Sequence, residues 1–162
     1  FYLAYIGGMP IVIIGLTSIA AGILYTAGPF PIGYHGMGDI FVFLFFGIIA
    51  VSGTYYLQTG YITQETLFCG IAIGFLATSI LVVNNLRDAD TDSKTGKNTL
   101  AVRFGKSFSK LEYFFFITIP FFIPIFLYFR WNKLSLWLPI FSLWRQQVLC
   151  LRGLHIGEGC DQ

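Results

Sequence analysis

Residues 84–105 of the chain read NNLRDADTDSKTGKNTLAVRFG, whereas almost every other long segment is apolar. Within these 22 residues the sequence places three acids and four bases, namely Asp88, Asp90, Asp92, Arg87, Lys94, Lys97 and Arg103. The stretch follows an uncharged run, 66–86, so we expect the helix of that run to continue into it. The sequence therefore predicts apolar helices arranged around one strongly charged surface.

The acids of this stretch have helical spacing. On a helix, Asn84, Asp88 and Asp92 at i, i+4 and i+8 form one stripe, whereas Asp90 projects from another face and is expected to be solvated. Carboxylates one turn apart, about 6 Å along the axis, can share a hard divalent cation. The bases Arg87, Lys97 and Arg103 are placed to hold the anion that such a cation brings. The pattern indicates a diphosphate site.

Two other readings of the stretch are simpler. A mixed run of charges between apolar segments is often a solvated loop. The spacing of the three acids also imitates the first ligands of a calcium-binding loop. That loop requires Gly at its sixth position and Glu at its twelfth, where this chain has Ser93 and Thr99. The calcium loop is therefore excluded.

Composition places the chain in a membrane. The 162 residues are 56% hydrophobic and 11% charged, and the mean hydropathy is +0.72, whereas soluble domains carry about 25% charge. Uncharged runs cover residues 1–38, 40–64, 66–86 and 113–129. Since about 20 apolar residues span a bilayer as a helix, the sequence predicts an all-α integral membrane protein.

We expect five membrane-spanning helices, at residues 3–25, 40–57, 66–86, 111–129 and 134–151. Alternating directions then place the Gly- and Pro-rich loop 26–39, the loop 87–110 and the C-terminal tail on one side of the membrane. That side carries eight Lys or Arg residues against two on the other, so the positive-inside rule makes it cytoplasmic. The two loops are expected to meet at the same surface.

The cysteines and the net charge suggest no further metal, disulfide or nucleic-acid site. The three cysteines Cys69, Cys150 and Cys160 are odd in number and lack CxxC spacing, so neither a disulfide framework nor a zinc site is predicted. The net charge of +2 gives no reason to expect a nucleic-acid partner.

The charged stretch also resembles a known motif. Asp88-x-x-x-Asp92-x-x-x-Gly96 with a following Thr99 resembles the second aspartate-rich motif of the UbiA superfamily of membrane prenyltransferases. The longer string over residues 84–103 resembles the 1,4-dihydroxy-2-naphthoate prenyltransferases of that superfamily. The loop from Tyr25 to Asp39 is similar to a Tyr-Thr-Gly-Gly-Pro … Gly-Leu-Gly-Asp/Glu segment of the same enzymes.

The resemblance implies transfer of a polyprenyl group from its diphosphate to 1,4-dihydroxy-2-naphthoate, a step of menaquinone biosynthesis in the bacterial inner (cytoplasmic) membrane. It implies Mg²⁺ bound by the catalytic residues Asp88 and Asp92. The diphosphate is expected at Asn84, Arg87, Lys97 and Arg103, and the substrate pocket is expected to include Tyr25, Gly28, Tyr34 and Asn85.

The resemblance also implies a fold of about nine helices with one aspartate-rich motif in each half. The five predicted spans and single motif correspond to the C-terminal portion of that fold, residues 1–144, whereas residues 145–162 depart from it as a divergent tail. We therefore expect catalysis to need the N-terminal half as well.

Three alternatives remain open. A sister prenyltransferase would act on 4-hydroxybenzoate, homogentisate or chlorophyllide, and the residues flanking the motif favour the naphthoate instead. A membrane protein that binds anionic lipids needs bases but no carboxylate stripe, which disfavours that class. An inactive membrane fragment is the third alternative.

Overall fold

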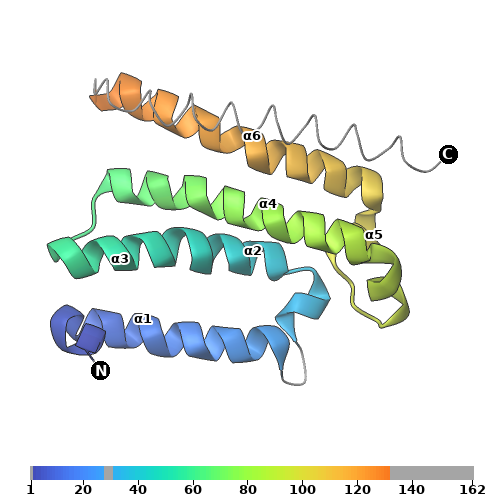
Figure 1. Ribbon diagram of the computed structural model, residues 1–162, viewed down its shortest axis with the longest axis horizontal. Helices are drawn as coiled ribbons and strands as arrows, with labels where there is room; N and C mark the ends of the chain where they lie inside the picture. Colours follow the sequence, from blue (N-terminus) through green and yellow to red (C-terminus); the bar gives the residue numbers. More distant parts are fainter. Residues whose placement is uncertain (1, 28–30, 132–162) are drawn as a thin grey trace. The chain divides into compact units, whose positions relative to one another are not determined.

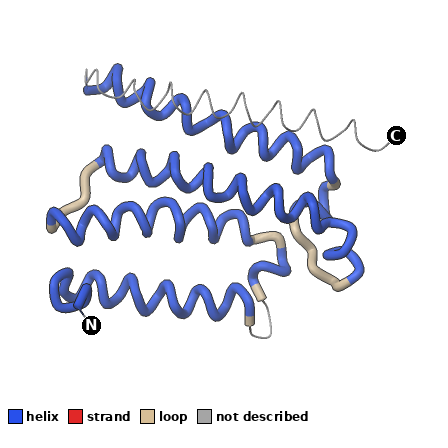
Figure 2. The backbone as a smooth tube through the Cα atoms, in the orientation of Figure 1, coloured by secondary structure: helices blue, strands red, loops and turns tan. Residues whose placement is uncertain are grey.

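The computed structural model describes residues 2–27 and 31–131, and these ranges are helical without a strand (Figure 2). The elements in chain order are α1 (Tyr2–Thr26), the 3₁₀ turn η1 (Ile32–His35), α2 (Gly38–Val42), the π-helical turn η2 (Phe43–Ile49), α3 (Ala50–Thr59), α4 (Gln64–Lys94), α5 (Leu100–Phe104) and α6 (Lys106–Trp131) (Figure 1).

Four of these helices are long and apolar enough to cross a membrane. They cover Tyr2–Thr26, the continuous helix Gly38–Thr59 formed by α2, η2 and α3, Gln64–Lys94 and Lys106–Arg130. Large apolar side chains stand exposed on them, Tyr5 to 90% for example, which suits lipid rather than water. The first four predicted spans and the helical membrane fold are confirmed. The fifth predicted span and the divergent tail lie outside the described residues.

Helix α1 is interrupted near its start. The sequence suggests a kink at Pro10, whose ring removes a backbone hydrogen bond. In the structure the backbone leaves helical geometry two residues earlier, at Gly8, with φ 63° and ψ −158°. Glycine adopts this positive φ without strain, so the interruption of α1 lies at Gly8 and not at Pro10.

One face of α4 organises the packing of the residues before it. Its buried positions Thr66, Gly70, Gly74, Thr78 and Val82 recur every four residues and are mostly small. The π-helical turn η2 lies directly on this face: a Cβ on Gly47 would overlap Gly74 and would stand 2.6 Å from the Gly70 carbonyl oxygen. Such close approach of backbones is how helices associate where water provides no hydrophobic driving force.

The same buried face continues into the charged stretch, at Asn85, Ala89 and Asp92. Packing within the membrane and the position of the acids are therefore fixed by a single helix. The chain divides into two compact units, Phe1–Pro120 and Phe121–Gln162. All the contacts that follow lie within the first unit.

Candidate active site

Helix α4 ends just beyond the predicted acidic stripe, and the sequence Thr95-Gly96-Lys97 explains how. Gly96 has φ 77°, a left-handed conformation that favours glycine. The backbone N–H of Lys97 then turns back and donates to the carbonyl of Asp92 at 3.0 Å. This is the hydrogen bond of a Schellman motif, and it fixes the direction in which the chain leaves the helix.

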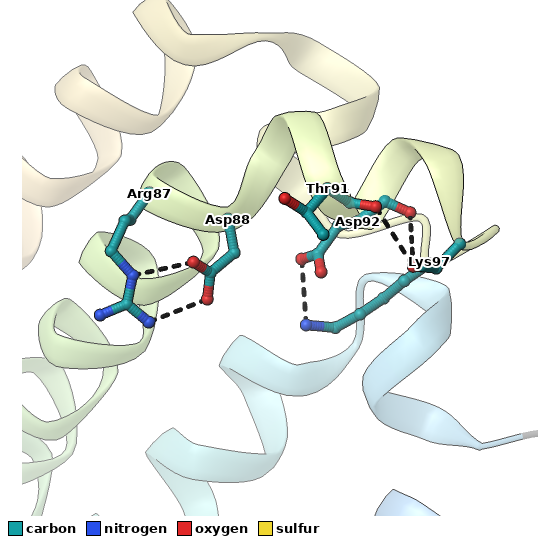
Figure 3. Close-up of polar contacts among 6 residues, drawn as sticks. Arg87, Asp88, Thr91, Asp92 and Lys97 are labelled. Atoms are coloured by element: carbon teal, nitrogen blue, oxygen red, sulfur yellow. Dashed lines mark hydrogen bonds and ion pairs between the residues drawn. The ribbon is translucent and has the colours of Figure 1, made fainter.

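The turn brings the side chain of Lys97 over Asp92. The Lys97 Nζ donates to Asp92 Oδ2 at 3.0 Å, and Figure 3 shows the two side chains pointing toward each other below α4. The Asp92 side chain is only 11% exposed, so solvent screens this pair weakly. Lys97 also interacts electrostatically with Asp88, one turn back along the helix. It is therefore the cation that both acids of the stripe share.

Asp88 is paired with its neighbour Arg87. The guanidinium donates from Nε to Asp88 Oδ1 at 2.8 Å and from Nη2 to Oδ2 at 2.9 Å, a two-pronged contact visible in Figure 3. The two side chains are 70% and 43% exposed. Exposed ion pairs stabilise a fold little, so Arg87 can exchange this carboxylate for another anion without disrupting α4.

Asp90 lies apart from this arrangement. Its carboxylate accepts a hydrogen bond from Lys106 Nζ at 2.6 Å, and both side chains are largely exposed. The contact ties the end of α4 to the start of α6. The expectation that Asp90 projects away from the other two acids agrees with this geometry.

The two asparagines before the acids differ in burial. Asn84 is exposed, whereas Asn85 is 8% exposed and lies on the packed face of α4 with Ala89 and Asp92. Helical spacing puts Asn84 in the stripe with Asp88, but of the two amides the structure buries only Asn85.

The first loop docks onto the segment that follows α4. The backbone N–H of Asn98 donates to the carbonyl of Tyr34 at 2.8 Å. A Cβ on Gly36 would stand 3.1 Å from the Asn98 carbonyl oxygen and 3.6 Å from Arg103 Nε, so a larger residue would disturb this contact. The expectation that the two loops meet is confirmed.

The remaining predicted pocket residues belong to this loop or to the helix before it. The Tyr25 ring packs beside Gly33, and its hydroxyl would be 3.0 Å from a Cβ on Gly38. Tyr25 also interacts electrostatically with Lys97, so it lies near the acidic stripe. Tyr34 is 43% exposed, and Gly28 falls outside the described residues.

The donor set suits Mg²⁺ in one respect and is incomplete in another. Asp88 and Asp92 offer hard carboxylate oxygens one turn apart, each now held by a base. Within residues 2–27 and 31–131, no group of three or more His, Cys, Asp or Glu side chains forms a metal site. Mg²⁺ commonly takes one or two carboxylates and completes its shell with water and phosphate oxygens. The residues fit a magnesium ion that arrives with a diphosphate.

Two acids close to this site were not among the predicted site residues. Asp39 lies in the first turn of α2 and is 7% exposed, and Glu112 lies within α6. Asp39 stands in the first turn of the span Gly38–Thr59, and Glu112 lies directly before the uncharged run 113–129. An ionisable residue in a membrane helix is itself a signal of function. That signal was present in the sequence.

The sequence of the chain matches a known protein family. The model of the UbiA prenyltransferase family matches residues 1–148. The chain belongs to the UbiA prenyltransferase family. Its similarity to the 1,4-dihydroxy-2-naphthoate octaprenyltransferase of Haemophilus influenzae is 52% identity over 92 residues, 57% of this chain and 30% of that protein.

Further relatives have the same name. The Escherichia coli enzyme is 48% identical over 94 residues, 58% of this chain and 30% of its own length. The Mycobacterium leprae enzyme is 41% identical over 111 residues, 68% of this chain and 38% of its own. This UbiA-family chain thus spans about a third of the length of the curated relatives that it matches. No solved structure matches it.

Proposed function

We propose that the protein transfers a polyprenyl group from polyprenyl diphosphate to 1,4-dihydroxy-2-naphthoate, with Mg²⁺ as cofactor. The observation that carries the proposal is the pair Asp88 and Asp92, one turn apart on α4, with Arg87 and Lys97 bound to them. The naphthoate is inferred from relatives named as 1,4-dihydroxy-2-naphthoate octaprenyltransferases. The test is formation of prenylated naphthoquinol by the full-length protein.

In this proposal the acids of the site bind the metal ion and the bases bind the diphosphate. Asp88 and Asp92 would hold the magnesium ion, which supplies positive charge at the leaving diphosphate. Arg87 and Lys97 exchange their carboxylate partners for phosphate oxygens, and Arg103, beside Gly36, faces the same region. Arg87 binds phosphate as a two-pronged donor, and Lys97 binds as a point charge. Asn84 is exposed nearby, where its amide can donate to the diphosphate.

The reaction starts when the bond between the allylic carbon and the diphosphate oxygen breaks. Stabilising the charge that grows on the departing diphosphate lowers the main barrier, and fixed cations do this without reorganising. The electron-rich naphthoate ring then attacks the allylic cation, and its carboxylate is lost as carbon dioxide. The hydrogen bond from Asn98 to Tyr34 holds the first loop beside the segment that follows α4. Closure of that loop over bound substrate would reduce access of water, which would otherwise quench the cation.

Lys97→Gln tests the role of the shared cation. In the full-length protein we expect the KM for polyprenyl diphosphate to rise roughly 10- to 100-fold, the usual effect of losing one charged hydrogen bond. The KM for the naphthoate should change little. The glutamine amide can still donate to Asp92, so folding is preserved.

Lys94→Gln is the matched control, because Lys94 is exposed in the last turn of the same helix. It removes the same charge without touching an acid of the stripe, and its kinetics should stay within about twofold of wild type. An equal loss in both variants would mean that Lys97 acts only through general electrostatics.

The site is proposed to face the cytoplasm of a bacterium, at its inner membrane. Six of the ten Lys and Arg residues lie in residues 87–110, at the end of the helices that carries the site. Positively charged loops are retained on the cytoplasmic side during insertion. The acceptor and the diphosphate would then reach the site from the cytoplasm or along the inner leaflet.

Single cysteines at Ser93 and Ser107 test this orientation. Both residues are exposed, one near the end of α4 and one at the start of α6. In a background without Cys69, Cys150 and Cys160, an impermeant maleimide should label these positions in inverted vesicles and leave them unlabelled in intact cells. Labelling in intact cells would show that these residues face away from the cytoplasm, opposite to the proposed orientation.

A further inference from the structure

Asp39 and Glu112 are acids on different helices that lie within electrostatic range of each other. Asp39 lies in the first turn of α2, and Glu112 lies within the first two turns of α6. The two groups are close enough to interact electrostatically. Neither is part of the pairs that Asp88 and Asp92 form with their bases. They are therefore a second acidic feature beside the proposed diphosphate site.

One carboxylate oxygen of Asp39 is buried without a hydrogen-bond partner among the described residues. This oxygen is Oδ1, and the residue is only 7% exposed. An unpaired buried carboxylate oxygen destabilises a fold, and in native proteins such a group calls for a specific explanation. A ligand that donates a hydrogen bond to this oxygen is one such explanation.

Tyr25 connects the acidic pair to the diphosphate site. It interacts electrostatically with Asp39 on one side and with Lys97 on the other. Its hydroxyl lies against Gly38, the residue that precedes Asp39. A ligand at Asp39 would therefore approach the diphosphate site from the side of Tyr25, as an acceptor must approach a donor.

Aromatic rings lie one turn deeper than each acid. Phe43 follows Asp39 by four residues, and Phe116 follows Glu112 by four, so each ring shares a helix face with its acid. Both rings contact Phe75 of α4, with centroid distances of 4.9 Å from Phe43 and 5.4 Å from Phe116. A row of three rings thus lies behind the acids, and aromatic rings make stacked or edge-to-face contacts with a flat aromatic ligand.

We propose that Asp39 and Glu112 form the hydroxyl-binding site for the aromatic acceptor, with Asp39 Oδ1 accepting a hydrogen bond from a ring hydroxyl. The inference rests on the prenyl transfer proposed above. A carboxylate beside a second carboxyl group disfavours an anion and attracts a hydroxyl donor, so the pair would bind the acceptor by its hydroxyl edge and keep its carboxylate away. A carboxylate that accepts this bond also increases the electron density of the ring that attacks the cation.

Asp39→Asn in the full-length protein, reconstituted in nanodiscs, tests the proposal by direct binding. The wild-type protein should bind 1,4-dihydroxy-2-naphthoate roughly 10- to 100-fold more tightly than the variant does. Both proteins should bind 2-naphthoate, which has no hydroxyl, with the same weak affinity. The KM for polyprenyl diphosphate and the dependence on Mg²⁺ should not change. The unfolding temperature should be equal or higher, because an unpartnered buried charge has been removed.

Asp90→Asn is the matched control, since it removes an exposed carboxylate from the same end of the unit. It should bind both naphthoates as wild type does. Glu112→Gln is the second variant should Asp39→Asn not fold, and it should also weaken binding of the dihydroxy compound alone.

Equal affinity of wild type and Asp39→Asn for the dihydroxynaphthoate would overturn the inference. A change confined to the Mg²⁺ requirement would overturn it too, because the acids would then serve a metal. Failure of the wild-type protein to form prenylated product would contradict the proposed function. If that protein still bound 1,4-dihydroxy-2-naphthoate roughly 10- to 100-fold more tightly than 2-naphthoate, the hydroxyl-binding site would remain supported.

Discussion

Replacing Asp88 or Asp92 by alanine is expected to lower the turnover of the full-length protein about 100- to 1,000-fold. Each change removes a carboxylate from the proposed magnesium site, and losing one preorganised group that stabilises developing charge commonly reduces turnover by about 10²–10³. It also leaves a base without its partner, Arg87 in one case and Lys97 in the other. The measurement is steady-state release of diphosphate at saturating Mg²⁺.

Asp90→Ala is the comparison that makes this prediction specific. Asp90 lies two residues from each of the other acids, yet its carboxylate is exposed and bound to Lys106. Its loss should change turnover by no more than about twofold, since exposed ion pairs contribute little. Losses of similar size in all three variants would show that overall negative charge, and not the stripe on one face of α4, supports the reaction.

The second large effect is expected from Gly47→Ala. A Cβ at this position would overlap Gly74 and crowd the Gly70 carbonyl oxygen, both of which belong to the backbone of α4. Backbone atoms cannot move aside as a side-chain end can, so the helices must separate. Overpacking of this kind costs about 1–3 kcal/mol or more of unfolding free energy. Because the same face of α4 carries Asp92 further along, activity should fall with stability.

Gly15→Ala is the control for helix composition. Gly15 lies in the exposed interior of α1, where an added Cβ meets nothing within 4 Å. Alanine has the higher helix propensity, so stability should stay equal or rise by up to about 1 kcal/mol. The check is unfolding of both variants in detergent micelles by denaturant or heat. A Gly47→Ala protein as stable as wild type would contradict the close packing of η2 on α4.

The sequence allowed the helices to be located but not the way in which they pack. Uncharged runs located the first four spans because a bilayer requires long apolar segments. The stripe of Asp88 and Asp92 was predictable because the run before it is helical and uninterrupted, and α4 continues to Lys94. The π-helical turn Phe43–Ile49 was not predicted, because it follows no local pattern and lies where Gly47 meets α4.

The candidate site shows the same division. The sequence does not show which of Asn84 and Asn85 has a buried side chain, because burial depends on how the helices pack. The approach of Arg103 to Gly36 joins segments more than 60 residues apart in the sequence, which no local pattern encodes. Asp39 and Glu112 were visible as acids at the ends of apolar spans, but their electrostatic interaction depends on how α2 and α6 are placed beside α4.

The central claim is that this protein joins a polyprenyl chain to dihydroxynaphthoate at a site built on Asp88 and Asp92. The most direct measurement incubates the full-length protein in nanodiscs with polyprenyl diphosphate, Mg²⁺ and either 1,4-dihydroxy-2-naphthoate or 4-hydroxybenzoate, and quantifies prenylated product by mass spectrometry alongside released diphosphate. We expect prenylated naphthoquinol and diphosphate in equal amounts, no product when Mg²⁺ is chelated, and little product from the benzoate. Equal product from the benzoate, or undiminished product after chelation, would contradict it.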